Sequence, residues 1–252
     1  TTNRVFRDPS AWYHVVAVLD STQGTSTDRI KLYINGVEET SFASSSYPAQ
    51  NAVTEYLKNG GVTRVGDKGS GGNNWDGYLA EIFVLDGQAL TPTSFGEFDE
   101  DTNIWKPIDC KNNLTFGNNG FYLDFEDSSN LGNDASSNAS DFSANNIDAT
   151  NQSTDTCTNN FATMNPIASQ GGSNASSSVA TFTEGNLVVD AISSETVIAN
   201  IGVDTGKWYW EVKVLTDQDG LTIGGANQHF HLDAELGYNS PSSSSDAKIF
   251  GY

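Results

Sequence analysis

Residues 29–36 constrain the fold more than any other stretch of the chain. Apolar and polar side chains alternate strictly over residues 29–34, as in a β-strand with one buried face. Asn35-Gly36 follows at once, and because both residues tolerate a positive φ, this pair predicts a tight hairpin turn. Residues 37–42 are then expected to return antiparallel to the first strand.

The same order of a short apolar stretch and a turn recurs along the chain. Residues 11–20 are apolar on both faces and are expected to form a buried central strand. A helix start is indicated only at Thr91-Pro92, and Gly96 would end it after one turn. Further strands are expected at residues 62–66, 78–85, 121–125, 179–182, 187–189, 197–201, 207–215 and 221–224. The pattern predicts an all-β protein of antiparallel β-sandwiches.

The composition agrees with this fold class and excludes several functions. Turn-forming residues are abundant and only 17% of the 252 residues are charged, so long charged helices are not expected. The net charge of −20 disfavours binding to nucleic acids, which requires Lys and Arg. It disfavours anionic membranes in the same way. No apolar run approaches the roughly 20 residues that a membrane-spanning helix needs, so no membrane insertion is expected.

The first part of the chain resembles the laminin-G and concanavalin A-like family of jelly-roll sandwiches. Three stretches carry the resemblance: "WYHVVAVLD" from Trp12, "RIKLYINGV" from Arg29 and "WDGYLAEIFVLDGQALTPTSFGEF" from Trp75. The order of the three stretches is specific to this family, although each stretch alone is a weak signal. The resemblance implies the second half of such a domain, to about Pro107, and therefore an internal piece of a longer polypeptide.

A second resemblance concerns the last part of the chain. "GKWYWEVKV" from Gly206 is similar to the opening of a SPRY domain, which is also a β-sandwich, and "LTIGGANQ" from Leu221 fits the strand that follows it there. Trp208 and Trp210 share one face of the expected strand and are expected in its core.

The two resemblances imply three parts of the chain and a role in a virus particle. They imply a concanavalin A-like part at residues 1–107, an irregular polar connecting region at 108–177 with a strand at 121–125, and a SPRY-like part at 178–252. "GQALTPTSFGEFDEDTNIWKP" from Gly87 resembles a variant found in structural proteins of tailed bacteriophages. The pairing of the two modules is similar to that in virion fibre and appendage proteins.

Catalytic motifs are absent from the sequence, so the chain is not expected to be an enzyme. Acidic residues are abundant, but no pair sits in a distinctive motif, and Glu81 is expected as a solvent-facing strand residue. His14 lies inside the first strand and is expected to be a satisfied core histidine. His229 and His231 could share a metal ion from one strand face, but an exposed polar strand edge is the simpler interpretation.

One loop carries the residue types that bind sugars. Asn73, Asn74, Trp75 and Asp76 combine an aromatic platform with polar side chains on a glycine-rich loop. They are candidates for a rim that contacts glycans. The alternative is that Trp75 packs beneath a sheet edge and the glycines only permit the turn.

Metal binding and disulfide formation stay open at this stage. The concanavalin A-like resemblance implies that calcium could be held at a loop rim by Asp67, Asp76 or Asp86, but no ligand pattern is recognisable, so no cofactor and no metal ligand are assigned. Cys110 and Cys157 could form one disulfide or remain two thiols.

These features predict a structural or adhesive protein of a virion surface, such as a fibre, appendage or decoration subunit of a tailed phage. Its expected partners are other virion subunits, a second copy of the chain and a host surface glycan. One alternative is a secreted carbohydrate-binding or adhesion module of a cell-surface protein. A glycan-degrading tailspike is a further alternative. The expected location is the virion surface or another extracellular site.

Overall fold

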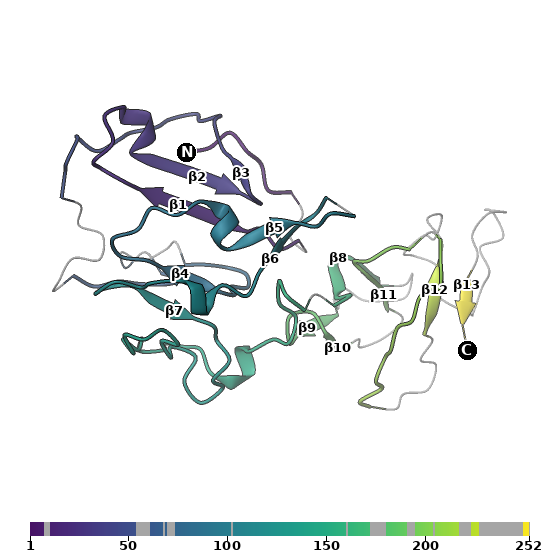
Figure 1. The fold of residues 1–252 in the computed structure, drawn as a ribbon. Coiled ribbons are helices and arrows are strands. Elements are labelled where there is room, and N and C mark those ends of the chain that lie inside the picture. The colour runs from purple at the N-terminus through teal and green to yellow at the C-terminus, as the bar shows by residue number, and fades with distance from the viewer. Residues whose placement is uncertain are drawn as a thin grey trace. The chain divides into compact units, whose positions relative to one another are not determined.

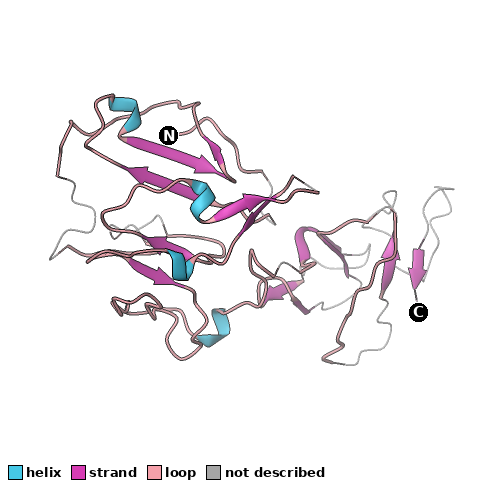
Figure 2. Cartoon of the chain, in the orientation of Figure 1, coloured by secondary structure: helices cyan, strands magenta, loops and turns pink. Residues whose placement is uncertain are grey.

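The computed structural model describes most of the first 159 residues and shorter stretches beyond them. The described residues are 1–7, 11–53, 61–67, 69, 74–101, 103–159, 161–171, 180–190, 195–203, 205–216, 223–226 and 249–251. They fold into short antiparallel strands with brief 3-10 turns between long loops (Figure 2). This confirms the all-β, antiparallel sandwich class. No described helix is long and apolar enough to cross a membrane.

The chain forms two compact units. Unit 1 comprises Thr1–Gln152 and Thr156–Asn160, and unit 2 comprises Ser153–Asp155 and Phe161–Tyr252. Residues 108–152, expected in a connecting region, therefore have their contacts within unit 1. The reason is visible in the strand pairing, because β7 (Phe121–Leu123) forms a ladder with β4 (Ile82–Val84).

The first sheet of unit 1 has the order β1-β2-β3, with β1 at Val15–Leu19, β2 at Ile30–Ile34 and β3 at Val37–Glu38. The predicted hairpin is confirmed: Ile34 pairs with Val37 across a turn in which Asn35 has φ 49° and Gly36 has φ 78°. The returning strand is shorter than expected, although Phe42 forms a bridge with Thr2.

The expectation of a buried central strand at residues 11–20 is wrong. The strand pairs on one side only among the described residues, and its side chains alternate between exposed and half-buried. Val15 is 55% and Leu19 is 41% exposed. They share one apolar face with their β2 partners Ile34 and Ile30, and of these four only Ile34 is buried.

The second layer of unit 1 contains β4 and β7 and lies below the first sheet in Figure 1. All three residues of β7 are buried, and Phe83 stacks on Tyr122 with the ring centroids 4.2 Å apart. The expected strand at 78–85 is reduced to Ile82–Val84 because Glu81 has φ 53°, outside the extended range.

The remaining elements of unit 1 are short strands and single 3-10 turns. η2 (Pro92–Ser94) is the predicted single helical turn, and β5 (Gly96–Phe98) with β6 (Trp105–Pro107) forms a ladder after it. The remaining 3-10 turns are η1 (Ser26–Asp28), η3 (Lys111–Asn113) and η4 (Ala149–Asn151). No strand forms at residues 62–66, which find no partner strand among the described residues.

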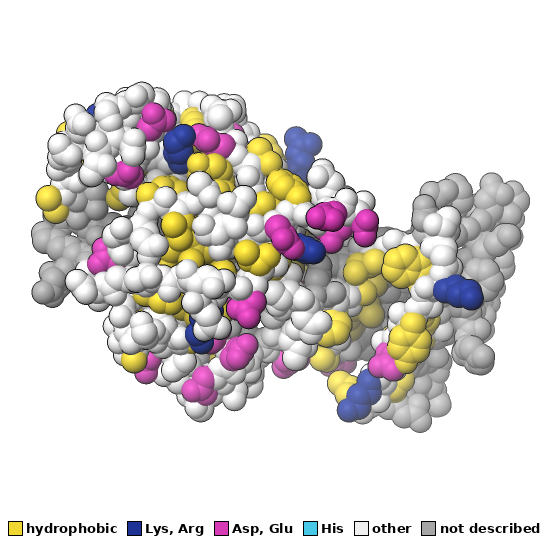
Figure 3. Space-filling view, in the orientation of Figure 1, with side chains coloured by type: hydrophobic (Ala, Val, Ile, Leu, Met, Phe, Trp, Pro, Cys, Tyr) yellow, Lys and Arg dark blue, Asp and Glu magenta, His cyan; other side chains and the backbone are white. Residues whose placement is uncertain are grey.

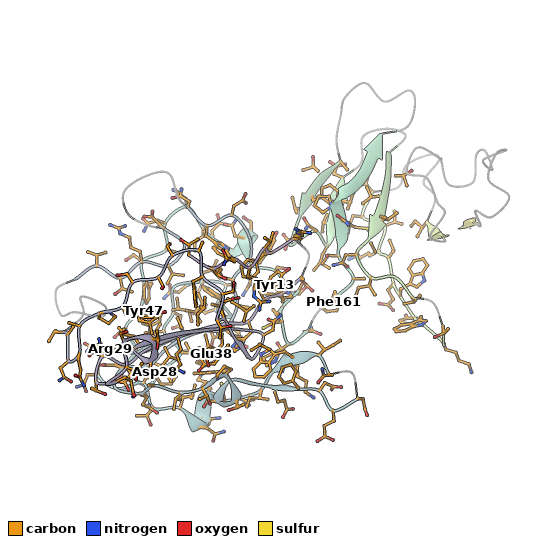
Figure 4. The ribbon with its side chains drawn as sticks, turned by 90° about the horizontal axis from the view of Figure 1, so that it is seen from above. Tyr13, Asp28, Arg29, Glu38, Tyr47 and Phe161 are labelled. Atoms are coloured by element: carbon orange, nitrogen blue, oxygen red, sulfur yellow. The ribbon has the colours of Figure 1, made fainter. Side chains whose placement is uncertain are left out.

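Arg29 closes one end of the first sheet. Its guanidinium donates hydrogen bonds to the carbonyl oxygens of Gln23, Gly24 and Pro48, each at 2.9 Å. Figure 4 shows Arg29, Asp28 and Tyr47 together at this end, with Tyr13 far from them along the sheet. The opposite end, which carries the hairpin turn, is the one that holds the pocket described below.

Unit 2 contains three described strand pairs. β8 (Met164–Gly171) pairs with β11 (Glu195–Ala199), β9 (Thr181–Thr183) with β10 (Val188–Asp190), and β12 (Gly224–Ala226) with β13 (Ile249–Gly251). The strands expected near 179–201 are thus present with shifted ends. The strand expected at 207–215 is not assigned, and residues 221 and 222 of the last expected strand lie outside the described residues.

Trp208 and Trp210 are not core residues in the described part of unit 2, contrary to the sequence prediction. They are 64% and 59% exposed. The physical reason is that, within the described part of unit 2, no strand pairs with the segment that carries them.

Candidate functional site

An open pocket lies at the hairpin end of the first sheet of unit 1, and it is a candidate for a binding site in the described part of the chain. Its volume is about 410 Å³. Its described lining residues come from the N-terminal segment, the β2–β3 turn and the β5–β6 connection: Arg4, Trp12, Ile34, Asn35, Val37, Phe98, Asn103, Ile104 and Trp105. The pocket thus joins residues that are about a hundred positions apart in sequence.

Trp105 forms one wall of the pocket and is held on two sides. Its indole Nε1 donates a hydrogen bond to Nδ1 of His14 at 3.0 Å, and the two rings stack with centroids 5.7 Å apart. The Phe98 ring meets Trp105 edge to face at 4.9 Å. His14 is thus a satisfied histidine, as expected, and it positions the indole.

The indole can lie where it does because residue 36 is glycine. A Cβ at this position would overlap two ring carbons of Trp105. The residue that permits the hairpin turn therefore also permits the close approach of the aromatic wall.

Arg4 is paired with a buried carboxylate at the edge of the pocket. Its Nε lies 2.7 Å from Oε2 of Glu39, a residue that is only 7% exposed. The hydrogen bond from Arg4 holds the pKa of Glu39 below its usual range. Because the two charges offset each other, the pocket carries little local charge in a strongly acidic chain.

The chemistry of the lining suits a sugar ring. Aromatic and aliphatic side chains offer faces for the C–H groups of a sugar, and the amide of Asn103 offers donors and an acceptor for hydroxyl groups. The amide of Asn35 offers its N–H groups, since its Oδ1 already accepts a hydrogen bond from the backbone N–H of His14 at 2.8 Å. The described lining residues include no carboxylate, hydroxyl, thiol or imidazole, so they present groups for binding and none for acid–base catalysis.

The described residues of the predicted glycan rim lie on unit 1 but do not line this pocket. Asn74, Trp75 and Asp76 are exposed, while Asn73 lies outside the described residues. Trp75 is 59% exposed, so it does not pack beneath a sheet edge. None of these residues lines the pocket, and the exposed Trp75 loop stays a second candidate for contact with a glycan.

The candidate calcium ligands do not converge in the described part of the chain. Asp67 pairs with Arg64 at 3.4 Å, and Asp86 accepts hydrogen bonds from both nitrogens of Asn119. No cluster of three or more acidic, histidine or cysteine residues suited to a metal ion is found among the described residues. His229 and His231 lie outside them.

Glu81 is not the solvent-facing residue that was expected. It is half-buried, and its Oε2 accepts a hydrogen bond from the Tyr122 hydroxyl at 2.5 Å. Burial raises the pKa of Glu81, and it also raises the pKa of Tyr122. The positive φ of Glu81 turns its side chain into this contact, so the pair is part of the packing of β4 on β7.

Cys110 and Cys157 are both thiols in the structure. Cys110 is buried in unit 1, and burial raises the pKa of its thiol, so the reactive thiolate is disfavoured there.

The first part of the chain is similar to a known protein family. Residues 1–94 match the family model of the concanavalin A-like lectin/glucanases superfamily. No curated protein and no solved structure matches the chain significantly. The matched residues include the first sheet, its hairpin turn and β4, so the concanavalin A-like jelly-roll predicted for the first segment is confirmed. A lectin-type domain of this kind is compatible with carbohydrate binding or adhesion.

Most of the pocket residues were not predicted from the sequence, and four of the nine lie outside the matched residues 1–94. Trp12 and Asn35 lie in stretches that the resemblance used, but their roles there were structural. Phe98, Asn103 and Trp105 lie in the stretch from Gly87 that resembles phage structural proteins, but no binding role was predicted for them. The only signal available was the aromatic content near residue 105, which does not indicate a partner at residue 12.

The bond between His14 and Trp105 makes the stability of unit 1 dependent on pH. Burial lowers the pKa of His14 from its usual 6.5, so protonation favours the unfolded chain. The contribution of His14 is complete above pH 6.5 and is lost as the pH falls below it. Between about pH 7.5 and about pH 5.5 the wild type should lose more unfolding free energy than His14→Gln, which does not titrate.

Denaturant unfolding of both proteins at the two pH values measures this difference. The side-chain amide introduced by His14→Gln retains an acceptor for the indole N–H, so the variant keeps the contact at both pH values. Equal losses in the two proteins would show that His14 does not titrate with unfolding.

Proposed function

We propose that the chain is a non-enzymatic structural and adhesive protein whose concanavalin A-like region contacts a surface glycan. The observation that carries this proposal is the pocket at the hairpin end, whose lining includes the aromatic residues Trp12, Phe98 and Trp105 together with Asn35 and Asn103. The family match over residues 1–94 supports the same class of ligand.

We further propose that this protein is a fibre, appendage or decoration subunit on the surface of a tailed-phage virion. The resemblance of residues 87–107 to phage structural proteins supports this setting, as does the resemblance of the stretches from Gly206 and Leu221 to the opening of a SPRY domain. The expected partners are other subunits of the particle and a host glycan, with no cofactor and no nucleic acid. A secreted adhesion module of a cell surface is the second candidate, because the family match supports it equally.

Glycan binding is tested with a pocket variant and a rim variant. Phe98→Ala removes a side chain that is 43% exposed and lines the pocket. For an oligosaccharide that the wild type binds, this variant should have an affinity about tenfold lower. The measurement is a glycan array followed by calorimetric titration of the bound oligosaccharide.

Trp75→Ala is the matched control, since Trp75 is an exposed aromatic residue of the same unit that does not line the pocket. Its affinity should equal that of the wild type. A loss with Trp75→Ala but not with Phe98→Ala would move the site to the predicted rim. Binding to no glycan, or release of reducing sugar from the bound one, would contradict the proposed function.

A further inference from the structure

Arg4 brings hydrogen-bond donors that are free to meet a ligand to the pocket of unit 1. It lines the pocket, and its side chain is 40% exposed. Its Nε is bonded to Oε2 of Glu39, whereas its Nη1 and Nη2 form no hydrogen bond or ion pair with another described residue. The N–H groups on these two nitrogens are therefore available to a molecule in the pocket.

Asn35 adds further donors to the same lining. Its Oδ1 already accepts the backbone N–H of His14, but its Nδ2 donates to no other described residue. The side chain of Asn103 can both donate and accept. In Arg4, Asn35 and Asn103 together, free donors thus outnumber free acceptors, so the pocket suits a ligand group that accepts hydrogen bonds.

The charge of the lining differs from that of the chain as a whole. The chain has 32 acidic and 12 basic residues, yet the described lining includes Arg4 and no acidic residue. Figure 3 shows acidic side chains scattered over the visible face of unit 1, with basic ones in fewer places. An anion is repelled by most of such a surface, whereas the pocket offers it a cation.

Glu39 holds the guanidinium in place without lining the pocket. This carboxylate is buried, and both of its oxygens are engaged, because Oε2 accepts from Arg4 and Oε1 accepts the backbone N–H of Ser41 at 3.1 Å. With Nε used in this way, the edge of the guanidinium that carries Nη1 and Nη2 remains as a two-pronged donor. Two parallel N–H groups of this kind match the two oxygens of a carboxylate.

We propose that the pocket takes an acidic sugar, and that Arg4 binds the carboxylate of this sugar through Nη1 and Nη2. This inference rests on the proposed function and narrows its ligand to glycans with a carboxylated sugar. The aromatic side chains of Phe98 and Trp105 receive the ring of the sugar, as they would for a neutral one. Because Glu39 offsets the charge of Arg4, the preference for the acid comes from directed hydrogen bonds more than from net charge.

The test compares acidic oligosaccharides with the same oligosaccharides after their carboxyl groups have been reduced to hydroxymethyl groups. The probes are oligomers of glucuronate, galacturonate, mannuronate and sialic acid. Calorimetric titration of the full chain at about 0.15 M salt gives the dissociation constants. The wild type should bind at least one acidic oligomer about tenfold more tightly than its reduced form.

Changes at the two members of the ion pair should act in opposite directions. Glu39→Gln keeps an acceptor for Arg4 and removes the negative charge beside it, so it should tighten binding of the acidic oligomer about threefold. Its affinity for the reduced oligomer should equal that of the wild type, since Glu39 does not line the pocket.

The double variant Arg4→Gln/Glu39→Gln removes the two-pronged donor without leaving a buried carboxylate unpaired. It should bind the acidic and the reduced oligomer equally well. Circular dichroism shows whether both variants keep the wild-type fold.

The proposal is overturned if the wild type binds the reduced oligomers as tightly as the acidic ones, or if the folded double variant keeps the preference for the acid. In either case a loss of affinity with Phe98→Ala would still support glycan binding in the pocket, so the two failures are distinguishable. If the wild type binds neither form of any oligomer, this proposal is overturned, and the glycan array then decides on the proposed function.

Discussion

Replacing Asp134 by Ala is expected to destabilise unit 1 by about 3–5 kcal/mol, the largest single effect that the structure supports. Asp134 is 4% exposed and organises the loop that packs on β7. Its Oδ1 accepts hydrogen bonds from the backbone N–H groups of Tyr122 and Ser136, both at 2.9 Å, and its Oδ2 accepts one from Ser140 at 2.8 Å.

The physical reason for this large effect is that three backbone N–H groups lose their hydrogen-bond acceptor. Burial by itself raises the pKa of Asp134, but the three backbone hydrogen bonds outweigh it and hold the pKa below its usual value. Alanine would leave three N–H groups without this acceptor: that of buried Tyr122, that of half-buried Ser136 and that of exposed Ser140. A buried donor left in this way costs about 1–3 kcal/mol, and a donor that water can reach costs less.

Asp127→Ala is the matched control for this prediction. Asp127 also accepts from the backbone N–H of Ser129, at 2.9 Å, and from its hydroxyl, but it is exposed. Its loss should destabilise unit 1 much less than the loss of Asp134, because water can reach the donors that it leaves. Denaturant unfolding and hydrogen exchange across residues 120–142 measure both variants. Equal losses in the two variants would show that burial of Asp134 does not matter.

Gly36→Ala is expected to destabilise unit 1 by about 2–4 kcal/mol and to disturb the pocket. A side chain at φ 78° costs about 1–2 kcal/mol. The new Cβ also overlaps the Trp105 ring, which must move and thereby loses its hydrogen bond to His14. Unfolding experiments and the tryptophan emission spectrum report the two parts of the effect.

Gly87→Ala separates backbone strain from the collision with Trp105. Gly87 has φ 83°, close to that of Gly36, but a Cβ there meets no atom within 4 Å. This variant should show only the backbone cost of about 1–2 kcal/mol, with an unchanged tryptophan spectrum. If Gly36→Ala behaves in the same way, the close packing of Trp105 on the turn is contradicted.

Local signals in the sequence were sufficient where the cause of structure is local. The Asn35-Gly36 turn follows from the positive φ that both residues tolerate, and the pairing of Ile34 with Val37 follows from that turn. The single helical turn at Pro92–Ser94 follows from the fixed φ of proline. Such features need no knowledge of what packs against them.

The sequence patterns predicted burial wrongly where burial depends on a second element that covers the strand. The two-sided apolar pattern of residues 11–20 predicted burial, but burial requires a covering layer, and Val15 and Leu19 lie on a face that is largely open. The same reasoning placed Trp208 and Trp210 in a core, although the described strands do not pair with them. Apolar periodicity reports which side chains favour burial and not whether a neighbour is present.

The sequence by itself determined the fold class of this protein, its antiparallel pairing and its hairpin, because turn chemistry and side-chain alternation act over a few residues. Only the tertiary structure decided that residues 108–152 pack in unit 1, that Glu81 turns to Tyr122, and that a pocket forms between Trp12 and Trp105. These contacts join distant parts of the chain, and their energies depend on three-dimensional packing that no local pattern records.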